Sequence, residues 1–215
     1  MELFTYYRST SSYRVRIALA LKGLEYQAVP VNLIAPDGGE HRQAAYLAIN
    51  PQGRVPALRT DEGGVLSQSP AIIEYLEERY PQVPLLSTDL LARAHERAVA
   101  SLIACDMHPL HNVSVLNRLR QLGQDEAQVI QWITQWISQG LEAVEAMIGD
   151  SGYCFGASPG LADVYLIPQA YAAERFNVSL APFPRIARVV SLAQQHPAFI
   201  TAHPANQPDT PPRVN

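Results

Sequence analysis

Four consecutive hydroxyl residues, Ser9 to Ser12, lie between a short apolar strand pattern and an apolar helical pattern. Serine and threonine favour the start of a helix, because their side-chain oxygens accept hydrogen bonds from first-turn amides that have no intrahelical partner. The helix dipole adds partial positive charge at the same end. The cluster is therefore expected to stabilise an anion.

A phosphate, a carboxylate and a thiolate all suit a site lined by hydroxyl groups and amides. The sequence lacks the glycine-rich fingerprints of phosphate and dinucleotide sites, so we expect an anionic sulfur atom. Taken alone, the cluster is explained equally well as an ordinary helix cap with spare surface serines. Other segments must decide between these two interpretations.

The size and charge of the chain exclude several classes of protein. Its 215 residues suffice for one domain or two small ones. The formal net charge of -4 comes without a Lys/Arg block, which argues against nucleic-acid or acidic-membrane partners. No signal peptide or membrane-spanning run is present, and Cys105 and Cys154 form neither a disulfide framework nor a closely spaced zinc ligand pair. We expect a soluble, cytoplasmic protein.

Two strand patterns flank the helix that follows the hydroxyl cluster. They cover residues 2–6 and 25–33, the helix spans about 12–22, and Gly23 stands where a helix C-cap is expected. This order predicts a βαβ unit. A turn-rich loop is then expected at 34–40 and a short helical stretch at 42–47. A hairpin is expected from 55–58 with 65–67, and a helix at 69–80 closes this half.

Residues 81–84, Pro-Gln-Val-Pro, are the best candidate for a domain boundary, since two prolines end the preceding helix and stiffen the link. Every later pattern is helical, with helices expected at 89–122, 125–148, 161–176 and 184–195. Pro109 should bend the first of these helices. The tail from His203 to Arg213 is expected to lie extended on the surface.

A small βαβ and ββα half followed by an all-helical half resembles the glutathione transferases, and the resemblance is closest to the zeta class. It spans almost the whole chain. The most discriminating segment is 7–19, in which the hydroxyl cluster precedes Arg-Val-Arg-Ile-Ala-Leu. Further matches lie at 47–51, 55–56, 67–76, 109–112, 161–163, 168–169, 173–176 and 207–211.

The resemblance implies an α/β plus all-α fold. A thioredoxin-like, glutathione-binding domain is expected at 1–82, followed by an all-helical substrate domain, a helical bundle, at 87–212. The family further implies glutathione as the cofactor, no metal, and a homodimer. Its activity implies a small dicarboxylic or diketo acid as the substrate.

By the same resemblance, Ser9 contacts the glutathione sulfur and Thr10 and Ser11 support it. Zeta-class sequences usually have Ser-Ser-Cys where this chain has Ser9-Thr10-Ser11. The cysteine thought to assist in that family is therefore absent here. This departure favours Ser9 as the main sulfur partner and leaves the role of Ser11 open.

Two further motifs are implied to hold the rest of glutathione. Val55-Pro56 resembles the cis-proline turn of thioredoxin-like folds, where the residue before the proline pairs its backbone with the cysteinyl group. Gln68-Ser69 matches the pair that binds the γ-glutamyl carboxylate. Alone, Pro56 would more often be an ordinary trans proline, and Ser69 a plain helix cap.

In the helical half, polar residues flank Pro109 and are expected to line the glutathione or substrate pocket: Asp106, His108, His111 and Asn112. Asp106 is a candidate for contact with the glutathione α-amino group, either within one subunit or across a dimer interface, with surface or interface packing as the alternative. A metal site built on the two histidines and Cys105 is a weaker hypothesis, because Pro109 spoils the regular helical spacing of ligands. His41 could meet the glycyl carboxylate.

The implied activity is glutathione-dependent cis–trans isomerisation of maleylacetoacetate to fumarylacetoacetate, a step of tyrosine and phenylalanine catabolism. The glutathione thiolate adds reversibly to the cis double bond, and the charge that develops needs stabilisation. Arg8 and Arg175 are the candidates for holding substrate carboxylates, since guanidinium matches carboxylate in a two-pronged geometry. Arg14 and Arg16, inside the helix, are expected to form structural pairs.

Three alternatives remain open at this point. Maleylpyruvate is a possible substrate, although its isomerases carry more basic character after the asparagine that matches Asn112, where this chain has Val113. Zeta-type sites also transform α-halo acids, because a thiolate can displace halide. A glutathione transferase-like interaction module without catalysis fits the intact binding motifs least well.

Overall fold

A computed structural model describes residues 1–36 and 38–212 of the chain. They form two compact units. The first comprises Met1–Pro84 together with residues 195–212, and the second comprises Leu85–Gln194. The carboxyl-terminal residues therefore join the first unit, whereas the sequence-based domain limits assigned them to the helical half.

A four-stranded sheet forms the centre of the first unit, with strand order β2-β1-β3-β4. Its strands are β1 (Glu2–Thr5), β2 (Gln27–Pro30), β3 (Ala57–Arg59) and β4 (Val65–Ser67). β1 pairs with β2 in parallel and with β3 in antiparallel, and β3 pairs with β4 in antiparallel. The predicted βαβ unit and hairpin are both confirmed, although β2 is shorter than the expected 25–33.

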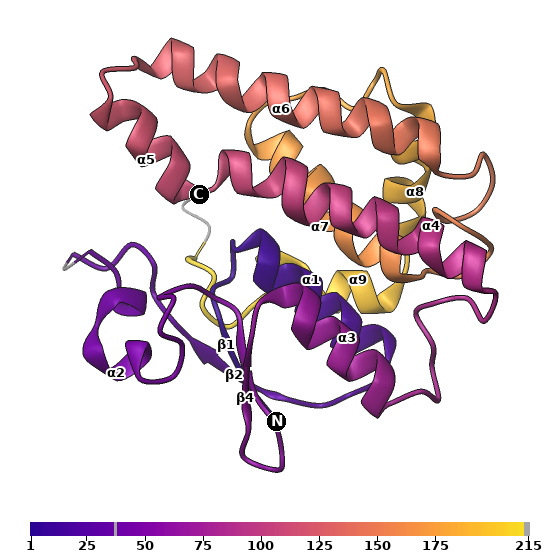
Figure 1. Ribbon diagram of the computed structural model, residues 1–215, viewed down its shortest axis with the longest axis horizontal. Helices are drawn as coiled ribbons and strands as arrows, with labels where there is room; N and C mark the ends of the chain where they lie inside the picture. Colours follow the sequence, from indigo (N-terminus) through magenta and orange to yellow (C-terminus); the bar gives the residue numbers. More distant parts are fainter. Residues whose placement is uncertain (37, 213–215) are drawn as a thin grey trace. The chain divides into compact units, whose positions relative to one another are not determined.

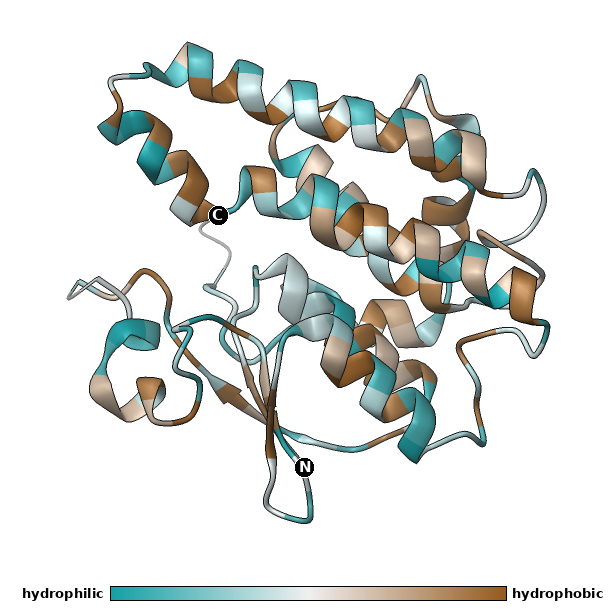
Figure 2. Cartoon of the chain, viewed as in Figure 1, coloured by the Kyte–Doolittle hydropathy of each residue, from teal (hydrophilic) through white to brown (hydrophobic). Residues whose placement is uncertain are grey.

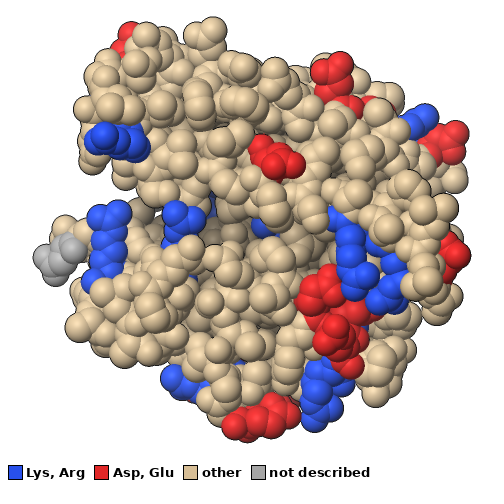
Figure 3. All heavy atoms as spheres, in the orientation of Figure 1, with Lys and Arg blue, Asp and Glu red and all other residues tan. Residues whose placement is uncertain are grey.

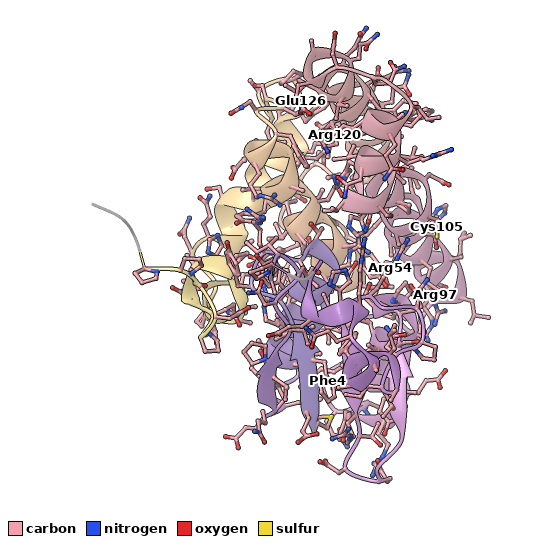
Figure 4. The ribbon with its side chains drawn as sticks, turned by 90° about the vertical axis from the view of Figure 1, so that its left-hand side faces the viewer. Phe4, Arg54, Arg97, Cys105, Arg120 and Glu126 are labelled. Carbon is pink, nitrogen blue, oxygen red and sulfur yellow. The ribbon has the colours of Figure 1, made fainter. Side chains whose placement is uncertain are left out.

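Four helices accompany this sheet (Figure 1): α1 (Thr10–Leu21), α2 (Ala44–Leu47), α3 (Ser69–Arg79) and α9 (Pro197–Ala202). Side chains alternate across β1, so that Thr5 faces α1 and Phe4 packs edge-on against Tyr46 of α2, with ring centroids 6.1 Å apart. Phe4, labelled in Figure 4, therefore belongs to a core beneath the second face of the sheet.

The first helix begins earlier than the expected Ser12, because Ser9 is its N-cap. At the other end Gly23 has a φ of +65°, a left-handed conformation that glycine adopts without steric cost. Both ends of α1 are therefore set by local sequence.

The carboxyl end differs from the expected extended tail. Helix α9 packs against α1 (Figure 1), a 3-10 turn follows at Pro204–Asn206, and Gln207 is buried. Prolines disfavour a long helix here but allow short turns. Arg213, at the end of the expected tail, and Asp37, within the expected turn-rich loop, lie outside the described residues.

The regular secondary structure of the second unit, over its described residues, is helical apart from one isolated bridge between Tyr153 and Gly156. Its α-helices are α4 (Leu90–Ser101), α5 (Val113–Gln121), α6 (Glu126–Met147), α7 (Leu161–Arg175) and α8 (Pro184–Ala193). Along α6, apolar and polar residues alternate around the helix as in other half-buried helices (Figure 2). Helix α7 is buried along nearly its whole length and supplies the core of this unit.

The helix expected at 89–122 is interrupted rather than bent. After α4 the chain continues as a π-helical segment, Leu102–Met107, and a 3-10 turn, His108–His111. Pro109 lacks an amide proton and cannot donate to the preceding turn, so the regular α-helical bonding cannot pass through it.

The loop before α7 is capped as expected. Asp163 accepts hydrogen bonds from the amides of Cys154 and Gly160, at 2.9 and 2.8 Å. Burial raises the pKa of this carboxyl group, and the two amide bonds partly oppose that effect. The prediction that Asp163 bonds back to loop amides is confirmed.

No helix among the described residues is long and apolar enough to cross a membrane. On the face seen in Figure 3, Lys and Arg side chains lie in scattered spots among uncharged and acidic residues.

Candidate functional site

The hydroxyl cluster caps α1 through Ser9. Its Oγ accepts a hydrogen bond from the amide of Ser12 at 3.2 Å, and its carbonyl accepts from Tyr13 at 2.9 Å. A hydroxyl group has two acceptor lone pairs and one donor hydrogen. Because the cap uses only a lone pair, Ser9 can cap the helix and also donate to an anion. The two interpretations of the cluster are therefore compatible.

Ser9 and Ser11 are half-buried, whereas Thr10 and Ser12 are buried. In the first helical turn the amides of Thr10 and Ser11 have no intrahelical acceptor, because that acceptor would lie before the helix. Thr10 can thus support an anion with its amide more readily than with its buried side chain. Ser9 and Ser11 present the partly exposed hydroxyl groups of the cluster.

Strand register brings the three predicted motifs to one edge of the sheet (Figure 1). Phe4 in β1 pairs with Ala57 in β3, which in turn pairs with Ser67 in β4. The residues that follow β1, precede β3 and follow β4 therefore meet at the same edge. These are the Ser9 turn, Val55-Pro56 and Gln68-Ser69, respectively.

The Val55-Pro56 peptide bond is cis, as the resemblance implied. The carbonyl of the preceding Arg54 accepts hydrogen bonds from Tyr46 Oη at 2.7 Å and from Asn50 Nδ2 at 2.6 Å. Burial raises the pKa of Tyr46 to about 12, so its hydroxyl keeps its proton and remains a donor. The side chains of Tyr46 and Asn50 thus hold the backbone just before the cis peptide bond.

Gln68 has a φ of +69°, an uncommon conformation for a residue other than glycine. Such backbone conformations are concentrated at functional sites. Its Nε2 donates to Gln52 Oε1 at 2.6 Å. Ser69 begins α3 and is buried, with its Oγ 3.5 Å from Arg14 Nη1. The start of α3 therefore offers amides and a hydroxyl to a carboxylate.

The arginines near the cluster lie in different surroundings. Arg8 is half-buried, and its guanidinium carbon lies 6.0 Å from the centre of the Tyr7 ring. Arg16 is fully buried and donates to Thr5 Oγ1 and to the carbonyls of Tyr7 and Ala202. Arg16 thus has the structural role expected of it.

His41 is half-buried, and its Nδ1 has no hydrogen-bond partner among the described residues. A Cβ on Gly39 would lie 2.5 Å from this ring, so the imidazole and the glycine backbone are in close contact. Burial, followed by the charge of Arg42, lowers the pKa of His41. Its contact with a glycyl carboxylate stays a prediction.

The polar residues around Pro109 are not alike. Asp106 is exposed on the π-helical segment, next to Cys105, whose side chain is labelled in Figure 4. His111 is buried, and its Nε2 lies 3.0 Å from Gln169 Nε2 and 3.2 Å from Gln169 Oε1. Asn112 caps α5 by accepting from the amide of Ser114 at 3.1 Å.

The geometry gives His111 and Asn112 structural partners inside their own unit. Half-buried His108 lies beside His111, with ring centroids 5.3 Å apart. Within residues 1–36 and 38–212, no group of three or more His, Cys, Asp or Glu is placed to hold a metal ion. Contact of these residues with glutathione stays a prediction.

Arg175 is exposed at the last position of α7. Its guanidinium carbon lies 5.4 Å from the centre of the Phe176 ring and 5.9 Å from that of Tyr171. A guanidinium group can stack on aromatic rings and also bind carboxylate oxygens along its edge. This placement suits the predicted role.

Two residues at the site were not predicted. Gln52 bonds to Gln68, and Asp209 Oδ2 accepts from the amide of Tyr7 at 2.8 Å. Asp209 lies in a segment that matched the family, but nothing local in the sequence pairs it with a residue 202 positions earlier.

Together, this edge of the sheet provides a hydroxyl donor, free first-turn amides of α1, and the start of α3. Such donors suit a ligand that carries an anionic sulfur and a carboxylate, as glutathione does. The residues present therefore fit the cofactor implied by the sequence.

Comparison with known proteins agrees with this geometry. Residues 3–84 match the glutathione S-transferase N-terminal domain, and residues 128–199 match the glutathione S-transferase C-terminal domain. The chain is 74% identical over 211 residues to maleylacetoacetate isomerase of Pseudomonas aeruginosa, covering 98% of this chain and 99% of that relative.

Two solved structures are also similar. The holo structure of a bacterial zeta-class maleyl pyruvate isomerase has a TM-score of 0.93 and 45% identity, covering 98% of this chain and all of the other. Maleylacetoacetate isomerase from Anaeromyxobacter dehalogenans 2CP-1, solved with GSH in its active site, has a TM-score of 0.88 and 40% identity. That match covers 98% of this chain and 97% of the other.

Proposed function

Because the chain belongs to the glutathione S-transferase family, we propose that it is the glutathione-dependent isomerase that converts maleylacetoacetate to fumarylacetoacetate. The observation that carries this proposal is the Ser9 hydroxyl at the start of α1, at the same sheet edge as the cis Val55-Pro56 turn and Gln68-Ser69. The 74% identity to maleylacetoacetate isomerase supports the choice of substrate.

Glutathione, when bound, supplies a thiolate that adds reversibly to the cis double bond of the maleyl group. Ser9 would hold the sulfur, the backbone of Val55 the cysteinyl group, and Gln68 with Ser69 the γ-glutamyl carboxylate. His41 is the candidate for the glycyl carboxylate. From the helical unit, Asp106, His108, His111 and Asn112 are proposed to line the pocket.

The main task of Ser9 is to keep the sulfur ionised. A free thiol has a pKa of about 8.5, so only a few per cent is ionised at neutral pH. Lowering this pKa by about two units requires roughly 2.7 kcal/mol of preferential stabilisation of the anion. One charge-assisted hydrogen bond together with a helix N-terminus supplies about that amount. Ser11 and the amide of Thr10 add further donors.

Two cations are proposed to bind the substrate. Arg8, next to Ser9, and Arg175, at the end of α7, would hold its carboxylate groups and oppose the negative charge that develops during addition. Each guanidinium is packed beside aromatic rings of its own unit, which limits its motion. No metal is needed for these roles.

The proposal is tested by a Ser9→Ala variant. We expect kcat/KM for maleylacetoacetate to fall about 10- to 100-fold, because the charge-assisted hydrogen bond of the hydroxyl contributes about 1.5–3 kcal/mol while the helix N-terminus remains. The pKa of the bound thiol, followed by its absorbance at 240 nm, should rise toward that of free glutathione. Ser9→Thr, which keeps a hydroxyl and a cap, should retain much of the activity.

Exposed Ser151 provides a matched control, since Ser151→Ala removes a hydroxyl far along the chain from the cluster. A correctly folded Ser9→Ala enzyme that isomerises as fast as the wild type would refute the role of Ser9. Absence of isomerase activity in the wild-type protein would refute the function itself.

Maleylpyruvate is the competing substrate, because a maleyl pyruvate isomerase is 45% identical. Val113, after the Asn112 cap, is exposed and apolar, whereas the maleylpyruvate isomerases carry more basic character at this point of the chain. We expect a higher kcat/KM for maleylacetoacetate when both substrates are assayed side by side.

We also propose that the protein is a homodimer of the cytoplasm. Leu90 and Leu91 at the start of α4 are 82% and 68% exposed, as apolar residues at an interface would be in one isolated subunit. Both cysteines are free, which suits a reducing compartment. Sedimentation at micromolar concentration tests the dimer, and Leu90→Glu should weaken it.

A further inference from the structure

The peptide groups around Tyr7 are held from two directions. The amide of Tyr7 donates to Asp209 Oδ2 at 2.8 Å, and its carbonyl accepts from Arg16 Nη2 at 2.9 Å. Two residues later, the amide of Ser9 donates to the carbonyl of Tyr6 at 3.0 Å. The tight turn that carries Arg8 and Ser9 therefore begins at a residue whose amide and carbonyl groups are both held by hydrogen bonds.

One of these two anchors comes from the far end of the chain. We call residues 203–212 the C-terminal strap. Within it, Gln207 Nε2 donates to the carbonyls of Thr201 and His203 at 3.0 and 2.9 Å. The amide of Thr210 donates to the carbonyl of Gln207 at 3.1 Å, and its Oγ1 donates to that of Pro204. Asp209 thus belongs to a fixed segment.

The partial burial of the Asp209 carboxylate indicates a role beyond stability. Its Oδ1 is buried and has no hydrogen-bond partner among the described residues. A buried carboxylate oxygen without a partner costs free energy, so the residue does not serve stability alone. The other oxygen of the same carboxylate, Oδ2, accepts the hydrogen bond from the Tyr7 amide.

We propose that Asp209 is a positioning residue for the Ser9 turn. By fixing the Tyr7 peptide, it sets where the Ser9 hydroxyl and the Arg8 guanidinium lie when glutathione and substrate bind. A displacement of about 1 Å in a catalytic group can cost up to 100-fold in rate, so an anchor two residues away is enough to matter. The inference rests on the proposed function of Ser9.

The test compares three variants in the full-length protein. Asp209→Ala removes the acceptor of the Tyr7 amide, whereas Asp209→Asn keeps an amide oxygen that can accept the same bond. Asp61→Ala is the control, because Asp61 is an exposed aspartate of the same unit that pairs with the terminal amino group. For each we measure kcat, the KM for glutathione, and the pKa of the bound thiol in the binary complex.

We expect Asp209→Ala to lower kcat at least tenfold and to raise the pKa of the bound thiol. Its KM for glutathione should change less than threefold, because Val55, Gln68 and Ser69 are untouched. Asp209→Asn and Asp61→Ala should stay within threefold of the wild type in kcat. A merely structural role would reduce the folded fraction without moving the pKa of the bound thiol in the molecules that remain folded.

The inference is overturned if folded Asp209→Ala keeps the wild-type kcat and thiol pKa, or if Asp209→Asn loses activity as severely as Asp209→Ala. Should Asp209→Ala not fold, Thr210→Val loosens the strap without touching the Ser9 turn. That variant should lower kcat several-fold, and an unchanged kcat would count against the inference. The thiol pKa needs no isomerase substrate, so this result stays separate from a failure of the proposed function.

Discussion

At the scale of single residues, the site combines structural and chemical roles in the same side chains. Ser9 caps α1 with a lone pair and has its hydroxyl hydrogen left for an anion. Gln68 holds a φ of +69° while it bonds to Gln52. The types of these residues were predictable from the motifs. The conformation of Gln68 was not, because a glutamine in the sequence carries no signal for positive φ.

The backbone of Gln68 leads to a prediction about stability and binding. Gln68→Gly should make the protein more stable by up to about 1 kcal/mol, since glycine adopts positive φ without steric cost. The same change removes the side chain proposed to hold glutathione, so the Kd for glutathione should rise. Urea unfolding and calorimetry measure the two effects separately.

For this variant Gln27→Gly is a suitable comparison, because Gln27 is exposed in a strand and glycine there should destabilise. Loss of stability in Gln68→Gly would mean that the strained backbone is not relieved.

At the scale of elements, most helices end where their sequences indicate. Helix α6 was expected at 125–148 and spans Glu126–Met147, with a capping box formed by Asp125 and Gln128. Beside it, Arg120 and Glu126 form an ion pair across the turn from α5, visible in Figure 4. The π-helical segment before Pro109 could not be predicted, because it depends on how a neighbouring helix packs.

Gly140 of α6 shows how closely this helix packs against the π-helical segment. A Cβ at this position would lie 2.3 Å from Met107 Cε and 2.9 Å from its Cγ, and Met107 is fully buried. On an open helix surface Gly→Ala would stabilise by about 1 kcal/mol. Here we expect Gly140→Ala to destabilise by about 1–3 kcal/mol because the core is overfilled.

Fluorescence of Trp132 and Trp136, which both lie on α6, follows this unit during urea unfolding. Met107→Ala in the Gly140→Ala background should recover part of the loss, because it makes room for the added carbon. Equal stability of Gly140→Ala and the wild type would show that Met107 moves aside at no cost.

At the scale of the whole chain, the two ends meet within the first unit. Arg16 bonds to the carbonyl of Ala202, 186 positions later, and the amide of Tyr7 bonds to Asp209. The first unit is therefore completed only when the last residues are in place, and contacts of such separation form late. Fold class followed from hydrophobic pattern and family motifs. The contact between the two chain ends could not be predicted, because prolines in the tail indicated only that no long helix could form.

His203 makes the contact between the two chain ends sensitive to acid. Its Nδ1 accepts a hydrogen bond from the amide of Ala205 at 3.1 Å, its ring stands edge-on to Tyr13, and Arg16 lies within electrostatic range. Burial, followed by the charge of Arg16, lowers the pKa of His203 below its ordinary value of about 6.5. The folded state thus favours the neutral ring, since protonation would remove the acceptor that Ala205 uses.

The sign of the pH effect follows from that shift. Above about pH 6.5 the ring is neutral in both folded and unfolded chains, and its contribution to stability is fully present. As the pH falls toward the lowered pKa of the folded protein, the unfolded chain takes up a proton first and the contribution is lost.

Amide exchange protection of residues 197–212 should therefore fall between pH 7.5 and 5.5. In His203→Asn, which caps without titrating, it should fall less, whereas His95→Asn, on an exposed face of α4, should behave like the wild type. Equal losses in the wild type and His203→Asn would place the acid sensitivity elsewhere.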